Sequence, residues 1–427
     1  MIRVVERRFL ALCIFVAAFV TTGPFIVMSA EPTVEVNPEP SSSVTLPTDT
    51  GSDDSSSLSL PHIPLTISLS AHGGYDDNFR TLQQSKGSWY TNGGGSLLYD
   101  LPTRSNHFSL RAGADVTYFL DHTNGQKDSI NAYISTSLIR NVSERLKLAA
   151  NAYATYRTEP DFGSNVGLDT RQGNFFRTLD DVSASYHWTK RFWTVTSDKF
   201  QLVQYDTSSG IAGSVNRFED TAGQEFKYDL FHANNTLVAE YRFEVIDYDT
   251  SPRDSITQFA LAGLDEQFTQ DLKGSVRGGG TFRSYTSGRE ETDPHFESSL
   301  SYAGAHHSTL SWRASYGIEE PSSADVLSRT TFRTGLELKY GLTARITATV
   351  SGYYHHDENR GAIPSSSTGM PMSRFSEDAF DISTNVKYAI NRRFTFDLGL
   401  QYSEINSQEA SRNYSRYRAF SGLTFTY

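Results

Sequence analysis

The sequence is poor in cysteine, in long apolar stretches and in clustered basic residues, and each shortage excludes a class of protein. The single cysteine, Cys13, cannot form a disulfide framework or a Cys-ligated metal site within the chain. One long apolar stretch is present, at 9–20, whereas a helical membrane protein needs several of about 20 residues. The net charge is −11 and no basic stripe is visible, so nucleic acid is not an expected partner.

Motifs for enzyme chemistry are also missing. The sequence contains no GxSxG, no HExxH and no P-loop. His306-His307 and His355-His356 are adjacent pairs, and adjacent strand residues point to opposite faces, so neither pair is a ready chelate. We therefore predict no enzyme, no cofactor and no metal site. A membrane-embedded hydrolase is the least favoured alternative. It stays open because folding can bring distant Ser, Asp and His residues together.

Aromatic residues are abundant in an otherwise polar chain. Tyr and Phe number 23 and 27, while hydrophobic residues make up only 37%. A disordered chain would lack these aromatics. A membrane β-barrel accounts for both features, because only alternate residues face lipid and aromatic residues gather at the two membrane interfaces.

Residues 1–30 read as a cleavable signal peptide. Basic residues fill 1–8, the apolar stretch follows, and small residues end the segment at Ser29 and Ala30. An uncleaved anchor helix is the alternative, and the abrupt change to a Pro- and Glu-rich sequence at Glu31 disfavours it. The bulky Leu12 directly before Cys13 also disfavours a lipoprotein.

Residues 31–62 are dominated by Pro, Ser, Asp and Thr, without apolar periodicity. Such a segment cannot bury enough apolar surface to fold alone. We predict a disordered periplasmic segment, with docking to a periplasmic partner as the alternative. It is too small to form a plug domain.

From residue 65 to the end, apolar and polar residues alternate with a period of two. Phe394, Phe396 and Leu398 share one face of a strand, while Thr395 and Asp397 share the other. The same alternation appears at 107–118, 237–246 and 332–340. A helix would need a period of 3.6. A soluble β-sandwich shows the same alternation. The lengths of the connections between strands therefore have to distinguish a sandwich from a membrane barrel.

Short and long polar connections alternate along the chain. The short ones are expected at 102–106, 141–144, 189–191, 232–235, 269–272, 305–308, 340–343 and 390–393. The long ones are expected at 77–87, 120–128, 158–174, 207–217, 249–254, 286–294, 319–326, 357–374 and 407–413. Outer-membrane barrels have short periplasmic turns and longer outer loops.

These connections predict an all-β fold: a transmembrane, antiparallel, up-and-down β-barrel of about 18 strands within 63–427. The even count puts both chain ends on the periplasmic side of the outer membrane. A count of 16 stays open. In 256–268 the sequence does not show which residues face lipid, and in 192–205 the apolar residues change face, which suggests a β-bulge at Asp198–Lys199. Glycine runs at 93–95 and 278–280 lie inside strands, where small residues permit bending or leave lumen space.

The end of the chain carries a further signal. Leu423, Phe425 and Tyr427 alternate with threonine, and the last residue is aromatic. This pattern resembles the terminal-strand signal that the barrel assembly machinery reads in outer-membrane proteins. It predicts that machinery and outer-membrane lipid as partners.

Charged side chains on the inferred inner face are the candidate pore-lining residues. A charge on the lipid face is costly, so the lumen is their expected place. Either they pair across the lumen and fill it, or they form a selectivity lining. Loops 158–174 and 357–374 are long enough to fold inward. The candidates are Arg111, Asp115, Lys147, Arg157, Glu225, Lys227, Asp229, Glu240, Arg242, Glu244, Arg277, Arg283, Arg313, Arg333, Glu337, Lys339, Arg345 and Asp397.

A short motif adds a family resemblance. Residues 70–80 read SAHGGYDDNFR, which resembles the opening GYDDN segment of a family of β-barrel porins of bacterial outer membranes. Members of that family are similar to barrels found with exopolysaccharide assembly and export genes. Asp76, Asp77 and Asn78 favour a turn, and two carboxylates are too few for a Ca²⁺ site.

The expected function is a pore for hydrophilic solutes. The resemblance implies polysaccharide and periplasmic export components as further partners. The alternative is a structural or surface-interaction barrel with a filled lumen.

Overall fold

The computed structural model describes residues 64–83, 86–103, 105–121, 128–158, 174–206, 216–230, 234–250, 253–304, 308–321, 326–362 and 374–427. The signal peptide and the polar segment predicted for 1–62 lie outside these residues. So do His306-His307 and most of the two loops expected at 158–174 and 357–374.

Eighteen antiparallel strands form one closed sheet, in which each strand pairs with its chain neighbours and β1 pairs with β18. The prediction of an 18-strand barrel is confirmed, and the count of 16 is wrong. The strands are β1 (Leu65–Asp76), β2 (Ser88–Pro102), β3 (Asn106–Phe119), β4 (Asp128–Asn141), β5 (Leu146–Thr158), β6 (Asn174–His187), β7 (Phe192–Tyr205), β8 (Arg217–Asp229), β9 (Asn235–Tyr248), β10 (Ser255–Gln267), β11 (Leu272–Tyr285), β12 (Glu290–Gly304), β13 (Ser308–Glu319), β14 (Val326–Gly341), β15 (Ile346–Ala362), β16 (Phe375–Ala389), β17 (Phe394–Ser407) and β18 (Tyr414–Thr426).

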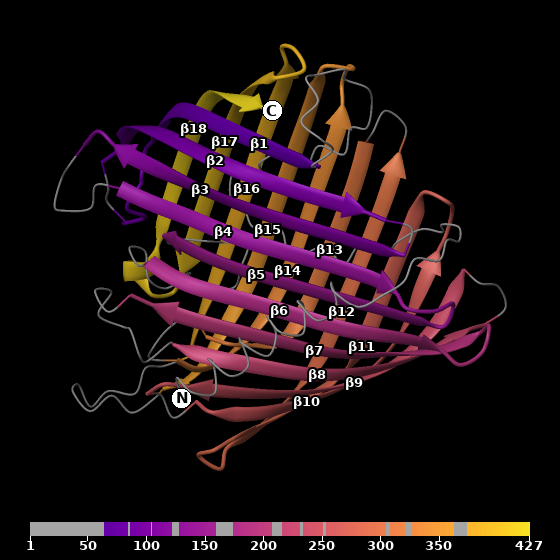
Figure 1. The fold of residues 1–427 in the computed structure, drawn as a ribbon. Helices are drawn as coiled ribbons and strands as arrows, with labels where there is room; N and C mark the ends of the chain where they lie inside the picture. Colours follow the sequence, from indigo (N-terminus) through magenta and orange to yellow (C-terminus); the bar gives the residue numbers. More distant parts are fainter. Residues whose placement is uncertain are drawn as a thin grey trace.

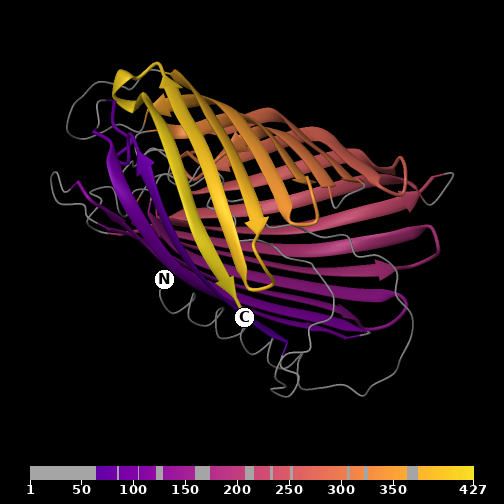
Figure 2. The same ribbon diagram turned by 90° about the horizontal axis from the view of Figure 1, so that it is seen from above.

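The strands are strongly tilted. Figures 1 and 2 show β1–β9 on one side of the barrel crossing β11–β18 on the other. A tilt of about 35–45° to the barrel axis produces such a crossing. The part of the chain that the structure describes contains no helix long and apolar enough to cross a bilayer.

Three details of the sequence prediction are wrong. The expected loop 286–294 is a short turn, because β12 already begins at Glu290 and Gly288 adopts a φ of 85°. The expected loop 357–374 begins later, because β15 continues to Ala362. The β-bulge at Asp198–Lys199 is absent, since β7 pairs in unbroken register with β6 and β8. The apolar residues of β7 seemed to change face only because polar residues occupy part of its outer face.

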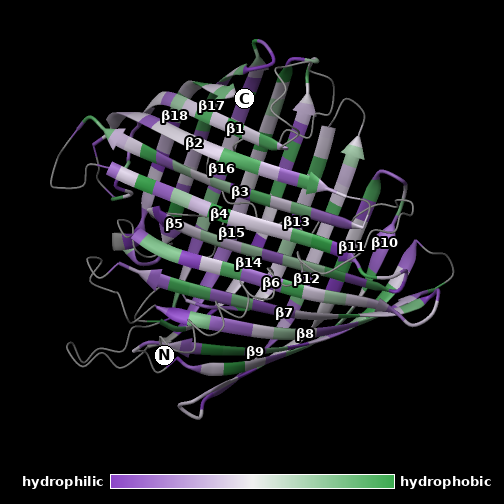
Figure 3. Cartoon of the chain, in the orientation of Figure 1, coloured by the Kyte–Doolittle hydropathy of each residue, from purple (hydrophilic) through white to green (hydrophobic). Residues whose placement is uncertain are grey.

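Alternation along the strands separates an outer from an inner face. On β1 the odd-numbered Leu65, Ile67 and Leu69 are exposed, while the even-numbered Gly74 and Asp76 are buried. Figure 3 shows apolar and polar residues alternating along the strands. The pairing register carries this assignment around the whole barrel, because directly paired residues share a face.

Glycines on the inner face permit two sharp folds of the sheet. A Cβ added at Gly263 or Gly279 would lie closer than 3.0 Å to backbone atoms of the paired strand at the β10–β11 seam. Gly74 and Gly422 show the same restriction at the β1–β18 seam. The sheet therefore bends most sharply at two seams on opposite sides of the barrel, as the interpretation of 278–280 anticipated.

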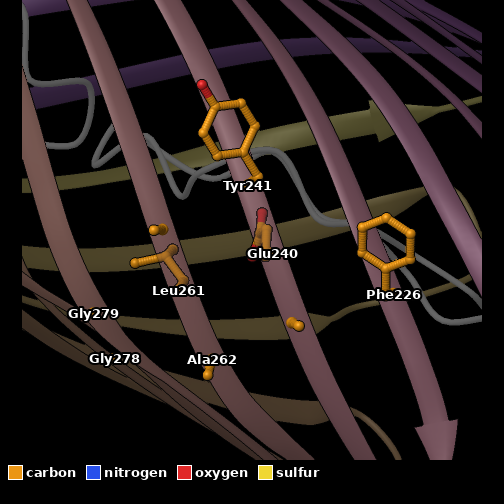
Figure 4. Close-up of a pocket in the computed structure, with 9 residues that line it drawn as sticks. Phe226, Glu240, Tyr241, Leu261, Ala262, Gly278 and Gly279 are labelled. Atoms are coloured by element: carbon orange, nitrogen blue, oxygen red, sulfur yellow. The ribbon is translucent and has the colours of Figure 1, made fainter.

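The outer surface beside the β10–β11 seam is shallowly hollowed. Ala262 of β10 and Gly278 of β11 line it, and the larger side chains of Tyr241 on β9 and Phe226 on β8 lie to one side of them (Figure 4). This hollow faces outward, because Ala260, Ala262 and Gly278 are small residues of the outer face.

Three aspartates depart from the expectation that charges avoid the outer face. Asp180 on β6, Asp198 on β7 and Asp220 on β8 share the outward face with Phe200. A basic side chain at the bilayer midplane costs about 2–4 kcal/mol, and an acidic one costs less. This part of the outer wall therefore differs from an ordinary lipid-facing surface.

The two neighbouring glycines of β11 provide a direct test of the fold. We expect Gly279→Ala to lower the free energy of unfolding by about 1–3 kcal/mol, because its methyl group meets backbone. Gly278→Ala meets nothing within 4 Å and should be neutral or stabilising by up to about 1 kcal/mol. Urea unfolding in detergent measures both, and equal effects would contradict the sharp fold at this seam.

Candidate functional site

The inner face of the barrel is the candidate site. Side chains on this face reach over intervening strands, which only a concave surface allows. Arg242 on β9 binds Glu297 on β12 with an Nη1–Oε1 distance of 2.7 Å. His72 on β1 lies 2.9 Å from Asp397 on β17. The strand register places every candidate pore-lining residue except Arg345 on this inner face.

Arg345 is a wrong assignment. It lies exposed in the turn between β14 and β15, where Thr343 Oγ1 accepts hydrogen bonds from the backbone N–H groups of Arg345 and Ile346. The alternation was extended one step too far, into a turn that has no inner face.

The same turn geometry occurs five times among the described turns at this end of the barrel, and its sequence signal was not used in the prediction. An apolar residue is followed by Ser, Thr or Asn, then any residue, then Arg or Asp, then another apolar residue. The Ser, Thr or Asn oxygen accepts the N–H groups two and three residues later, which fixes a tight turn. The capping residues are Ser143, Thr189, Thr269, Thr343 and Asn391.

Ion pairs neutralise much of the inner face between β8 and β12. Arg242 binds Glu240 as well as Glu297, and Glu297 also accepts from His295. Arg277 lies 2.7 Å from Asp265. These pairs join strands that lie within three positions of one another in the sheet, so they neutralise charge along one part of the wall.

A second network lies towards the end of the barrel that carries the longer connections. Its centre is Glu320, which follows β13 and is 9% exposed. Its carboxylate accepts from Arg283 on β11 at 2.6 Å and from the Tyr248 hydroxyl on β9. The guanidinium of Arg253 stacks on the ring of Tyr248 at 4.2 Å. The chain after β13 is thus tied to strands on the other side of β12.

The network continues through Arg329 on β14. Arg329 donates to the backbone carbonyl of Glu320 at 2.7 Å and pairs with Asp357 on β15 at 3.2 Å. Arg333 joins through Glu319 at 2.8 Å. Of this network, sequence reasoning found only Arg283 and Arg333. Glu320 and Arg253 lie outside the strands, where a period of two gives no signal.

The ionisation of Glu320 follows from its surroundings. Burial alone would raise its pKa, but the positive charges of Arg283 and Arg217, the Tyr248 hydroxyl and Arg253 outweigh burial and lower the pKa. Glu320 is therefore a carboxylate at neutral pH, and its negative charge holds the arginines around it.

The GYDDN segment lies at the closing seam of the barrel. Asp76, fully buried at the end of β1, forms a bidentate pair with Arg416 of β18. Asp77 accepts the backbone N–H of Tyr417 at 2.7 Å. The Asn78 side chain donates to the carbonyls of Leu82 and Ser415. Each of the three residues forms a turn or seam contact.

A basic wall lies on the inner face of β3 to β7. We use this name for Arg111, Lys147, Arg157, Arg177 and Lys199. No carboxylate of the described residues lies within 4.0 Å of the charged groups of Arg111, Lys147 or Lys199.

The same inner face of β3 to β7 has two acidic residues. Asp115 accepts from the amides of Asn92 and Asn131, and Asp181 stands opposite Lys199. Cations exceed anions here, so the basic wall can attract mobile anions. Within the described residues no group of three or more His, Cys, Asp or Glu is arranged to hold a metal ion.

Replacing Glu320 tests the buried network. We expect Glu320→Gln to lower the free energy of unfolding by about 3 kcal/mol, the low end for a broken buried pair, because Arg283 loses its nearer carboxylate and keeps only Glu244 at 3.5 Å. Glu358→Gln is the control, since its pair with Arg360 is exposed and worth at most about 1 kcal/mol. Thermal unfolding in detergent at neutral pH measures both.

The pH dependence adds a second readout. Because the pKa of Glu320 is lowered, its stabilisation is complete above the ordinary glutamate pKa of about 4.3 and is lost as the pH falls through the lowered value. The difference between the wild type and Glu320→Gln should stay constant from neutral pH down to that region. A difference that disappears at higher pH would contradict a charged Glu320.

Comparison with solved structures gives weak similarities to outer-membrane barrels. The siderophore receptor PirA from Acinetobacter baumannii is 7% identical, with 86% of this chain and 81% of that chain covered and a TM-score of 0.44. A ferric enterobactin receptor from Pseudomonas aeruginosa is 9% identical, with the same coverage and the same score. OccAB3 from A. baumannii is 10% identical, with 85% and 99% covered and a score of 0.41. These similarities are too low to support an argument about function.

No curated protein is significantly similar to this chain. A family model, in contrast, matches residues 65–427, which include every strand of the barrel. The chain therefore belongs to the outer-membrane barrel family described as "Putative beta-barrel porin 2".

Proposed function

We propose that this barrel is a passive pore for hydrophilic solutes. The observation that carries the proposal is a closed sheet of 18 strands whose inner face bears charged side chains that have no ion-pair partner among the described residues. Barrels of 16 to 18 strands are wide enough to leave an aqueous channel. Membership of a porin family supports the same reading.

The orientation belongs to the proposal as well. Both ends of the barrel domain lie at the end with the capped tight turns. Short turns are typical of the periplasmic side and longer loops of the outer side. We therefore assign the chain ends to the periplasm. Residues 1–30 act as the export signal, and Leu423, Phe425 and Tyr427 act as the assembly signal.

Export of exopolysaccharide is the narrower part of the proposal. It rests on the GYDDN resemblance and on the aromatic surfaces inside the barrel. The rings of Tyr133, Tyr353 and Phe420 cover the space above inner-face glycines of neighbouring strands. Aromatic faces supported in this way offer flat apolar surface to the C–H faces of sugar rings. Periplasmic export components would then be partners.

A barrel with a filled lumen is the second candidate. The ion pairs among Arg242, Glu240 and Glu297, and the network around Glu320, favour it because they occupy lumen space. This candidate predicts a membrane protein that conducts no ions.

Conductance in planar bilayers separates the two candidates. The purified, folded full-length protein should insert and give stepwise conductance in KCl. Protein heated until unfolded is the control and should give no steps. A folded barrel that gives no steps at any voltage would overturn the pore and leave the filled barrel.

The role of the basic wall is tested by its two mid-strand cations. We expect the double variant Arg111→Gln, Lys199→Gln to lower the anion-to-cation permeability ratio, because two unpaired positive charges leave the lumen. The zero-current potential in a KCl gradient measures this ratio. Arg345→Gln is the control and should leave it unchanged, since Arg345 lies in an exposed turn.

To test export of exopolysaccharide, a strain that lacks the gene for this protein is compared with its parent for the amount of secreted polymer. Reduced secretion that the wild-type gene restores would support export. Normal secretion would remove export and leave the general pore standing.

A further inference from the structure

The outer wall of the barrel is not uniform around its circumference. On β5 to β8 the outward side chains are mostly small or polar, and we call this area the small-residue sector. Its members include Ala150, Ala152, Asp180, Ala184, Thr194, Thr196, Asp198, Asp220, Ala222 and Gln224.

The wall formed by β14 to β17 has the opposite character. Near mid-strand its outward side chains include more large apolar residues, such as Leu336, Val350 and Leu400, which are 47%, 44% and 59% exposed. That wall is suited to hydrocarbon. The contrast shows that the small-residue sector does not follow from the barrel fold itself.

Asp180 and Asp198 lie near the middle of their strands. Asp180 is opposite Phe200, and Asp198 is opposite Val182, so the two carboxylates are diagonal neighbours on adjacent strands. Other outward charges of the described strands lie closer to strand ends, as Asp128 and Glu290 do. Mid-strand acids are disfavoured against lipid, which indicates that a polar partner covers this sector.

A groove in the sector has charges of opposite sign on its two sides. Ala150, Val182 and Ala184 lie at its centre, Arg140 of β4 borders it on one side, and Asp198 of β7 borders it on the other. A two-fold axis through the groove would exchange these sides between two copies. Arg140 of one copy would then approach the acidic side of the other.

We infer that the small-residue sector is the contact surface between two copies of this chain in the outer membrane. Small residues let backbones approach closely, and polar side chains bind across the contact, as in other membrane-embedded interfaces. Two-fold pairing places the same patch on both copies, which is the commonest symmetry of homo-oligomers. The inference does not depend on the pore, because it concerns the outer wall alone.

Cysteine cross-linking in native membranes tests the inference. The only cysteine of the chain is Cys13, so Cys13→Ser gives a background without thiols. Ala184→Cys places one thiol at the centre of the groove, and Val350→Cys places one on the apolar wall as a matched control. With an oxidant, Ala184→Cys should give a disulfide-linked band of twice the monomer mass, and Val350→Cys should not.

Replacing the two mid-strand aspartates provides the second part of the cross-linking experiment. Adding Asp180→Val and Asp198→Val to the Ala184→Cys chain should reduce the cross-linked fraction at least twofold, while cold-SDS mobility shows that the barrel still folds. A cross-linked fraction that does not change, together with higher thermal stability, would mean that the acids face lipid and would overturn the inference. So would equal cross-linking of Ala184→Cys and Val350→Cys, no cross-linking, or a product of another mass.

Discussion

Closure of the sheet between β1 and β18 is the constraint on which the rest of the structure depends. A bilayer offers no water to backbone N–H and C=O groups, so a sheet that crosses it must have no open edge. Here Ser68 to Asp76 pair with Thr426 to Arg418, and the last residue exchanges two backbone hydrogen bonds with Ile67. The buried Asp76–Arg416 pair secures the same seam. The two ends of the barrel sequence therefore form one interface, and the barrel exists only when both are in place.

Closure also determines what each face can carry. Once the sheet is closed, alternate residues meet water and lipid, and an inward side chain can reach partners that are distant in sequence. Arg242 on β9 meets Glu297 on β12, and Glu320 after β13 meets Arg283 on β11, each across at least one intervening strand. Many charges near β8 to β15 bind one another in this way. On the basic wall, no carboxylate of the described residues lies within 4.0 Å of the charged groups of Arg111, Lys147 or Lys199. The lumen thus combines a neutralised sector with a basic one.

The sequence errors have physical causes. A β-bulge was inferred at Asp198–Lys199 because apolar residues seemed to change face, but the strand is regular and the outer wall itself is polar there. The charged stretch after Gly288 looked like a loop, yet Glu291, Asp293 and His295 are inward strand residues that water or partners can satisfy. Arg345 followed the alternation into a turn. In each case a polar side chain was interpreted as a sign of irregular backbone or of a position in the lumen. The polarity of a side chain indicates its surroundings and does not indicate the backbone conformation.

The sequence alone determined the fold class and nearly every strand boundary, and it favoured 18 strands while leaving 16 open, because a closed membrane barrel imposes a period of two and places polar turns between strands. It also determined the inner face, since charge and lipid exclude each other over most of the wall. Only the tertiary structure decided which charges pair, where the sheet bends sharply at Gly263 and Gly279, that Glu320 joins strands on both sides of β12, and that Asp180 and Asp198 lie outside. These features depend on distances between strands far apart in sequence, and a local periodicity contains no information about such distances.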